Sequence, residues 1–142
     1  MTVAQLLEPL AVRDAIEEMT DEVLEEAGKV LETMSPDSDW DVWVEANRAF
    51  HQTLYSAARS HRLTAIIKSL QDPTVMFVST ALKRHPELRR RADTEHRRLL
   101  QAMREGDITA AVELTLTHLT IPLVEADDSV PGPVPDESGG DR

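Results

Sequence analysis

The stretch that decides the fold class is PELRRRADTEHRRLLQAMREGD, residues 86–107. Pro86 suits the first position of a helix, and Gly106 suits the residue just past its end. Between them apolar side chains recur every three or four positions, which is the period of a helix with one buried face. That face carries Leu88, Ala92, His96, Leu99 and Met103. The pattern predicts a long amphipathic helix with a histidine on its inward side.

Helical periodicity extends over most of the chain. Helices are expected over about residues 3–18, 21–34, 39–59, 61–70, 86–104 and 108–123. Asp72-Pro73 is expected to kink the fourth helix or to divide it, and Val75 to Leu82 is the one segment with a strand-like pattern. The sequence therefore predicts an all-α fold, an antiparallel bundle of about six helices with a disordered acidic C-terminal tail.

The chain length fits one domain followed by that tail. We expect the domain to occupy residues 1–124 of the 142, because residues 125–142 have no periodicity and are rich in Pro and Gly. Residues 125–142 contain six acidic side chains and one basic one, a net charge of −5 out of −11 for the chain. The tail is therefore expected to stay outside the core.

Composition excludes several classes of protein. The chain has no cysteine, which rules out disulfides, thiolate metal sites and cysteine nucleophiles. It has no apolar run long enough for a membrane span, and its first residues lack the pattern of a signal peptide, so we expect no signal peptide and a cytoplasmic protein. The net charge of −11 disfavours general nucleic-acid binding. Seven basic side chains in residues 83–98 are expected to form a solvated helix face rather than a nucleic-acid site.

Three of the five histidines lie on apolar helix faces: His51, His96 and His118. A buried imidazole without a partner costs about 1–3 kcal/mol. A shared divalent metal would satisfy all three, since neutral imidazoles bind such ions and facing helices commonly hold them. The alternative is that each histidine is satisfied separately by its neighbours. His61 and His85 lie at helix starts and are expected on the surface.

Several motifs together carry a family resemblance. His96 follows His51 by 45 residues, and His118 follows His96 by 22. The motifs are LEPLAVR (7–13), NRAFH (47–51), EHRRLLQAMREGD (95–107), AA (110–111) and HL (118–119). In order and spacing they resemble the FCD domain, the C-terminal effector-binding domain of the FadR subfamily of GntR-type bacterial transcription regulators. The resemblance covers about residues 4–123.

The resemblance implies a helical bundle with a divalent metal at its centre. Matched residue by residue, the family's ligands fall on Asn47, His51, His96 and His118. Zinc is the first candidate, with nickel, manganese or iron as alternatives. Open positions on the ion would accept a small organic acid or sugar acid, and the domain would be a homodimer that relays binding to paired DNA-binding domains.

The chain departs from the family pattern in three places. Asn47 stands where the family often has Asp, so the site would keep the full +2 charge of the metal and favour an anionic effector. Residues 71–77 depart from the family helix that often supplies an arginine for the effector carboxylate. Arg13 is another candidate for binding that carboxylate, and the alternative is that it is a solvated or salt-bridged arginine. The family's winged helix-turn-helix domain has no counterpart here. The chain is then a fragment, a misassigned start or a stand-alone sensor, and by itself is not expected to recognise DNA sequence.

Two other functions remain open at this point. The first is a metal-dependent hydrolase or isomerase that uses the same three-histidine site, and the second is a metal-free helical interaction module. No nucleophile or phosphate-binding motif is present, and Glu95 points to a different side of its helix from His96. We therefore assign no catalytic residue and expect an effector-sensing domain rather than an enzyme.

Overall fold

The structure, a computed structural model, describes the backbone of residues 3–35 and 37–127, and their side chains apart from 4–5, 71–82 and 118–127. Within this part of the chain every regular element is a helix, which confirms the predicted all-α class. The helices are α1 (Val3–Glu17), α2 (Asp21–Thr33), α3 (Trp40–Tyr55), α4 (His61–Arg84), α5 (Pro86–Glu105) and α6 (Ile108–Asp127).

The helix ends follow local chemistry. The Thr20 side chain accepts a hydrogen bond from the backbone N–H of Val23 at 3.3 Å and so caps α2. Gly106 ends α5 with a φ of 65°, a left-handed conformation that favours glycine. The next residue, Asp107, accepts from the N–H of Ala110 at 3.1 Å and caps α6. The sequence predicted all three of these ends.

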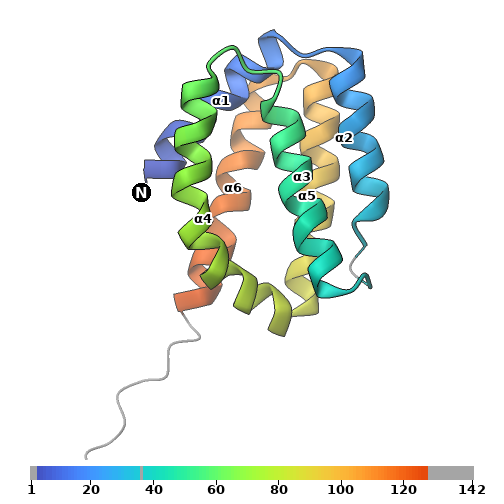
Figure 1. The fold of residues 1–142 in the computed structure, drawn as a ribbon, viewed down its shortest axis with the longest axis vertical. Coiled ribbons are helices and arrows are strands. Elements are labelled where there is room, and N and C mark those ends of the chain that lie inside the picture. Colours follow the sequence, from blue (N-terminus) through green and yellow to red (C-terminus); the bar gives the residue numbers. More distant parts are fainter. Residues whose placement is uncertain (1–2, 36, 128–142) are drawn as a thin grey trace, which may run out of the picture.

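Three expected boundaries were wrong. Val75 to Leu82 is helical rather than strand-like, because it forms the last part of α4. Tertiary packing of α4 against α1, α5 and α6 favours the helix over the local strand-like pattern. The bend in the second half of α4 agrees with the kink expected near Pro73 (Figure 1). α6 continues to Asp127, so the first residues assigned to the tail are helical. Residues 128–142 lie outside the described part of the chain.

The third difference is that α3 ends at Tyr55, several residues before the expected end. The connection that follows is tied to the end of α1. The backbone N–H of Ser60 donates to the Asp14 carboxylate at 3.0 Å, and Arg59 pairs with Glu18. These tertiary contacts stabilise a turn where the local pattern alone predicted more helix.

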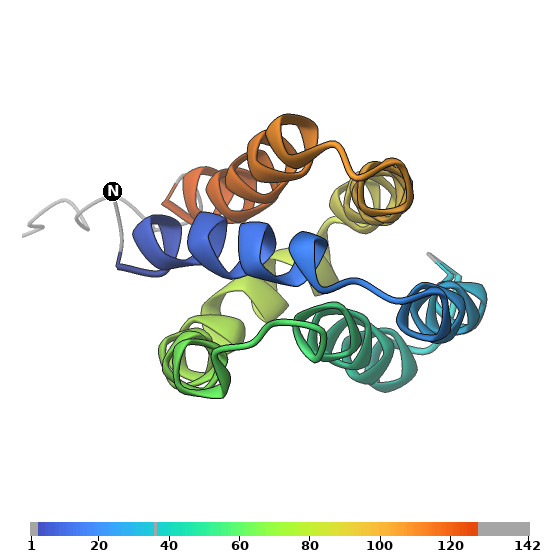
Figure 2. The same ribbon diagram turned by 90° about the horizontal axis from the view of Figure 1, so that it is seen from above.

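The first helix packs between two helices from later in the chain. Figure 2 shows α1 running between α6 on one side and α4 on the other, and it packs against both. α2 packs against α3 and α5, and α5 packs against α6. Within the described residues, no helix combines the length and the apolar character that a membrane span requires.

The core is mainly aliphatic, and among the described side chains its two large buried aromatics both come from α3. Trp43 is 1% exposed and Phe50 is fully buried. The other members of the buried cluster include Val12, Ala27, Met34, Leu54, Leu88, Ala92, Leu99, Leu100, Met103 and Ala111. This core brings α3 and the first half of α5 together, and these two segments carry the polar residues described next.

Candidate functional site

One face of α3 carries most of the polar side chains near the core. Trp43, Asn47, His51 and Tyr55 follow one another at intervals of four residues, so they leave the helix on the same side. Trp43 is buried, whereas the other three are partly buried. The row thus runs from the apolar core toward more accessible positions.

His96 comes from α5 and faces this row. Its side chain is 1% exposed. Its ring centroid lies 5.0 Å from that of Phe50, 5.1 Å from that of His51 and 6.4 Å from that of Trp43. The structure therefore brings together two histidines that are 45 residues apart in the chain, in a largely aromatic environment.

The side-chain oxygen of Asn47 adds a third polar group. Oδ1 is buried and has no hydrogen-bond donor among the described residues. Leaving a buried carbonyl oxygen unsatisfied costs about 1–3 kcal/mol, so it is unusual without a compensating ligand. Asn47 lies one turn before His51 on the same helix face, which places the oxygen on the side of the two imidazoles.

The spacing of the two imidazole rings is compatible with a shared divalent cation. Two imidazoles that bind one ion at nitrogen–metal distances of about 2 Å have ring centroids about 4.5–5.2 Å apart, for an octahedral or tetrahedral angle at the ion. The observed separation of 5.1 Å between His51 and His96 agrees with that value. An amide oxygen is a further competent donor. The ligand role of these side chains remains a prediction.

Of the other two predicted residues, one lies outside the described side chains and one is on the surface. His118 lies on α6, and its side chain falls outside the described residues. Arg13 is exposed on α1, whereas Glu8 and Ala11 of the same helix are buried. Among the side chains that are described, no group of three or more His, Asp or Glu residues has the arrangement of a metal site.

Asp93 is a buried acid that our sequence interpretation did not identify. It lies one turn before His96 on α5 and is 3% exposed. Its Oδ1 accepts a hydrogen bond from Nε1 of Trp43 at 3.1 Å and lies 3.9 Å from Nδ1 of His96. The pKa of Asp93 is raised above its ordinary value, because the effect of burial outweighs the lowering effects of the Trp43 hydrogen bond and of the charges of Arg97 and Arg89. Its position in the sequence could have indicated its burial, because a residue three positions before His96 lies on the same inward face of the helix.

Glu8 and Tyr55 form a second buried polar pair. The Tyr55 hydroxyl donates to Oε1 of Glu8 at 2.6 Å, and Glu8 is 2% exposed. Burial raises the pKa of Tyr55 well above its ordinary value, and the charge of Glu8 and the hydrogen bond raise it further. The Tyr55 ring centroid is 6.5 Å from that of His51, so this pair adjoins the histidines. The sequence interpretation missed it, because an acid among leucines at the start of a helix usually faces solvent.

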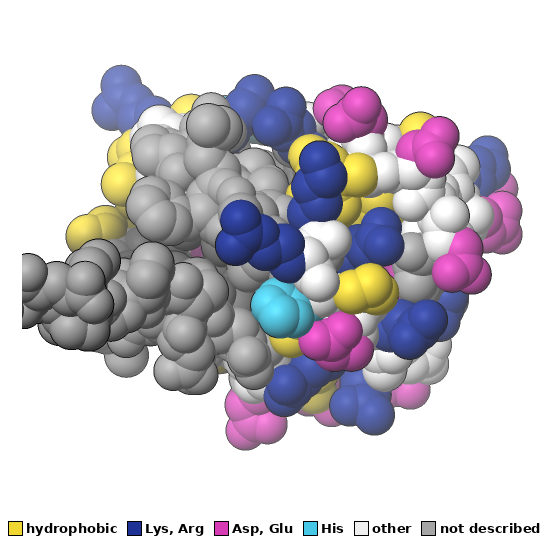
Figure 3. Space-filling model, turned by 90° about the horizontal axis from the view of Figure 1, so that it is seen from below, with side chains coloured by type: hydrophobic (Ala, Val, Ile, Leu, Met, Phe, Trp, Pro, Cys, Tyr) yellow, Lys and Arg dark blue, Asp and Glu magenta, His cyan; other side chains and the backbone are white. Residues whose placement is uncertain are grey.

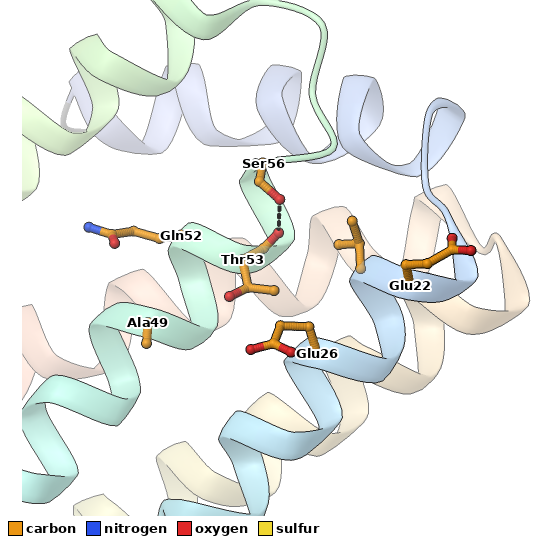
Figure 4. A pocket seen from close by; sticks show the side chains of 7 residues that line it. Glu22, Glu26, Ala49, Gln52, Thr53 and Ser56 are labelled. Carbon is orange, nitrogen blue, oxygen red and sulfur yellow. Dashed lines mark hydrogen bonds between the residues drawn. The ribbon is translucent and has the colours of Figure 1, made fainter.

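The groove in Figure 4 lies elsewhere, between α2 and α3. Its walls are formed by Glu22, Val23, Glu26, Ala49, Gln52, Thr53 and Ser56. It is open to solvent, and the Ser56 hydroxyl donates to the Thr53 carbonyl at 2.6 Å along its edge. None of the predicted site residues lines it, so it is separate from the histidines.

Basic side chains gather where α4 passes into α5. Figure 3 shows Lys and Arg side chains spread over the described part of this face, with Asp and Glu among them. Arg91 pairs with Glu95 at 3.7 Å, and the Arg89 guanidinium lies over the Trp40 ring at 5.7 Å from its centroid. The basic residues are exposed or partly exposed, as expected for a solvated helix face.

Comparisons with known proteins agree with this architecture. The family model of the FCD domain matches residues 1–120. E. coli McbR/YncC has a similar solved structure, with a TM-score of 0.77 and 22% identity over 89% of this chain and 61% of that one. The chain therefore spans about three fifths of that protein's length, and the likeness concerns the fold. Among curated proteins, none matches the chain.

Proposed function

The chain belongs to the FCD domain family, and on that premise we propose that it senses a small carboxylate effector through a divalent metal. The observation that carries the proposal is the 5.1 Å separation of the His51 and His96 rings beside the buried, unsatisfied Oδ1 of Asn47. His118 of α6 would complete the ligand set. Zinc is the first candidate, with nickel, manganese or iron as alternatives.

A bound metal would supply positive charge to attract and hold a carboxylate. The residues of this chain set the conditions for that binding. Trp43 and Phe50 exclude water on the core side, which strengthens electrostatic attraction. Asn47 ligates without adding negative charge, so the metal keeps its full charge for an anionic effector.

The relay to transcription is also part of the proposal. We expect the domain to form a homodimer and to change how paired DNA-binding segments are presented when the acid binds. Arg13, exposed on α1, would reach the effector only if the effector extends to the surface. The proposed domain division is residues 1–124, followed by the acidic tail.

The direct experiment is metal analysis of the purified protein, followed by thermal unfolding with a panel of organic and sugar acids. A ligand that binds the folded state raises the apparent free energy of unfolding, by about 2.7 kcal/mol at a hundredfold excess over Kd. We expect His96→Ala and His118→Ala each to lose the metal and the acid response together. His61→Ala, at an exposed histidine, is the matched control and should keep both.

Each result discriminates between the functions left open above. Retention of metal and acid response in either inward variant would show that the ligand assignment is wrong. A folded wild-type protein that binds no divalent metal would favour the helical interaction module. Conversion of a bound acid into a product would favour the hydrolase or isomerase.

A further inference from the structure

A carboxyl group lies against one of the predicted ligands without belonging to the ligand set. Asp93 is 3% exposed and lies on the same face of α5 as His96, three residues earlier. Its neighbours in that part of the core are mainly apolar and aromatic. A buried acid in such a place carries a large desolvation cost and is kept only where it makes specific contacts.

The contacts of Asp93 distinguish the two nitrogens of His96. Oδ1 of Asp93 lies 3.9 Å from Nδ1 of His96, which is longer than a hydrogen bond but close enough for electrostatic attraction, so Nδ1 is the ring nitrogen on the Asp93 side. A ring that uses Nδ1 toward a carboxyl group offers Nε2 to a metal. Histidines that bind metals commonly have their second ring nitrogen held by a carboxylate or carbonyl, which fixes both tautomer and ring orientation.

Trp43 holds Asp93 in that position. Its indole N–H donates to the same Oδ1 at 3.1 Å, in a buried hydrogen bond between α3 and α5. Trp43 lies one turn before Asn47 and two turns before His51 on α3. The hydrogen bond therefore joins the helix that carries two predicted ligands to the helix that carries the third.

We propose that Asp93, held by Trp43, is the positioning residue of His96. It keeps the proton of the neutral imidazole on Nδ1 and so makes Nε2 the nitrogen that carries the lone pair for a metal. The metal part of this inference rests on the proposed function, whereas the hold of Asp93 on the ring does not.

The first test reads the tautomer directly. Nitrogen-15 NMR of the histidine rings in the metal-free full chain separates the Nδ1–H form from the Nε2–H form. We expect the Nδ1–H form of His96 in the wild type and a shift toward the Nε2–H form in Asp93→Asn. The amide still accepts from Trp43 but holds the ring proton more weakly. Asp41→Asn makes the same chemical change at an exposed site of α3 and should leave the ring unchanged.

The second test measures zinc affinity by competition with a chelator. Loss of such a partner typically weakens metal binding by about 10–100-fold, and we expect Asp93→Asn to fall in this range while Asp41→Asn stays at the wild-type value. Trp43→Phe removes the hydrogen bond but keeps an aromatic ring. It should give a smaller loss of affinity together with a mixture of His96 tautomers, and it replaces Asp93→Asn if that variant does not fold.

The outcomes separate the two proposals. An Nε2–H ring in the wild type, or an unchanged His96 signal in folded Asp93→Asn, would overturn the role of Asp93. If the wild type binds no zinc but the tautomer shifts as expected, the proposed function fails and the positioning role stands. If zinc binds and neither variant changes the ring or the affinity, the proposed function survives and Asp93 is only structural.

Discussion

The two halves of α5 bury different kinds of side chain. Residues 86–96, the polar half, bury Asp93 and His96 together with Leu88 and Ala92, and Asp93 and His96 are at most 3% exposed and face Trp43 and Phe50 of α3. In the second half the buried residues are Leu99, Leu100, Ala102 and Met103. Burial of aliphatic side chains stabilises the fold directly, whereas burial of an acid and an imidazole costs free energy that their contacts must offset. The polar half is therefore where we place function, and the aliphatic half is where we place stability.

The largest expected effect comes from breaking the aliphatic half. Leu99→Ala should lower the free energy of unfolding by about 2–5 kcal/mol, because it removes buried methyl groups and leaves a cavity. Chemical denaturation of the metal-free protein measures this. Ile66→Ala, at a side chain that is 49% exposed, should cost much less. A loss equal to that of Ile66→Ala would show that the second half of α5 is not the stabilising half.

A smaller effect is expected at the edge of the polar half. Tyr55→Phe removes the hydrogen bond to Glu8 and should lower the free energy of unfolding by about 1–3 kcal/mol. The folded-state pKa of Tyr55 is raised, so its contribution is fully present below the ordinary tyrosine pKa and is lost as pH rises through the folded value. The wild type should therefore lose stability in alkali above about pH 10, and Tyr55→Phe should lack this part of the loss.

Tyr55 is the single tyrosine of the chain, so tyrosinate absorbance reports on it alone. We expect its alkaline titration to lie above the ordinary value in the folded protein and to return to that value in denaturant. A titration at the ordinary pKa in the folded protein would contradict the buried pair. Metal binding by Tyr55→Phe would then show how far the polar half depends on that pair.

The smallest effect is expected at the end of the aliphatic half. Gly106→Ala places a side chain at a φ of 65°, which costs about 1–2 kcal/mol for an L-residue, although its Cβ would meet no other atom within 4 Å. The thermal midpoint should fall modestly, while metal content and acid response stay as in the wild type. A change in metal content would mean that the two halves of α5 are coupled through its backbone.

Much of the fold could be predicted because its signals are local. The Thr20 cap, the glycine after α5 and the Asp107 cap each act within a few residues. The apolar face that placed His96 inward is likewise a property of one helix. Errors arose where distant contacts decide the outcome, as at the end of α3, where Asp14 and Glu18 of α1 stabilise the turn into α4.

The candidate site was predictable only in part. Helical period placed His51 and His96 on inward faces, but it contains no information on the distance between two helices. Asp93 and Glu8 were missed because their burial depends on partners about 50 residues away, Trp43 and Tyr55. An acidic side chain is ordinarily assigned to the surface, and only the partner on another helix reverses that assignment.

The sequence by itself determined the helical class, most helix ends and the inward direction of two histidines, because these follow from interactions between residues a few positions apart. Tertiary structure alone decided that the His51 and His96 rings lie 5.1 Å apart, that the side-chain oxygen of Asn47 is buried, and that Trp43 donates a hydrogen bond to Asp93 next to His96. The physical reason is that these arrangements depend on how α3 and α5 are placed relative to each other, which lets their long side chains meet. That placement is set by the whole core rather than by either helix.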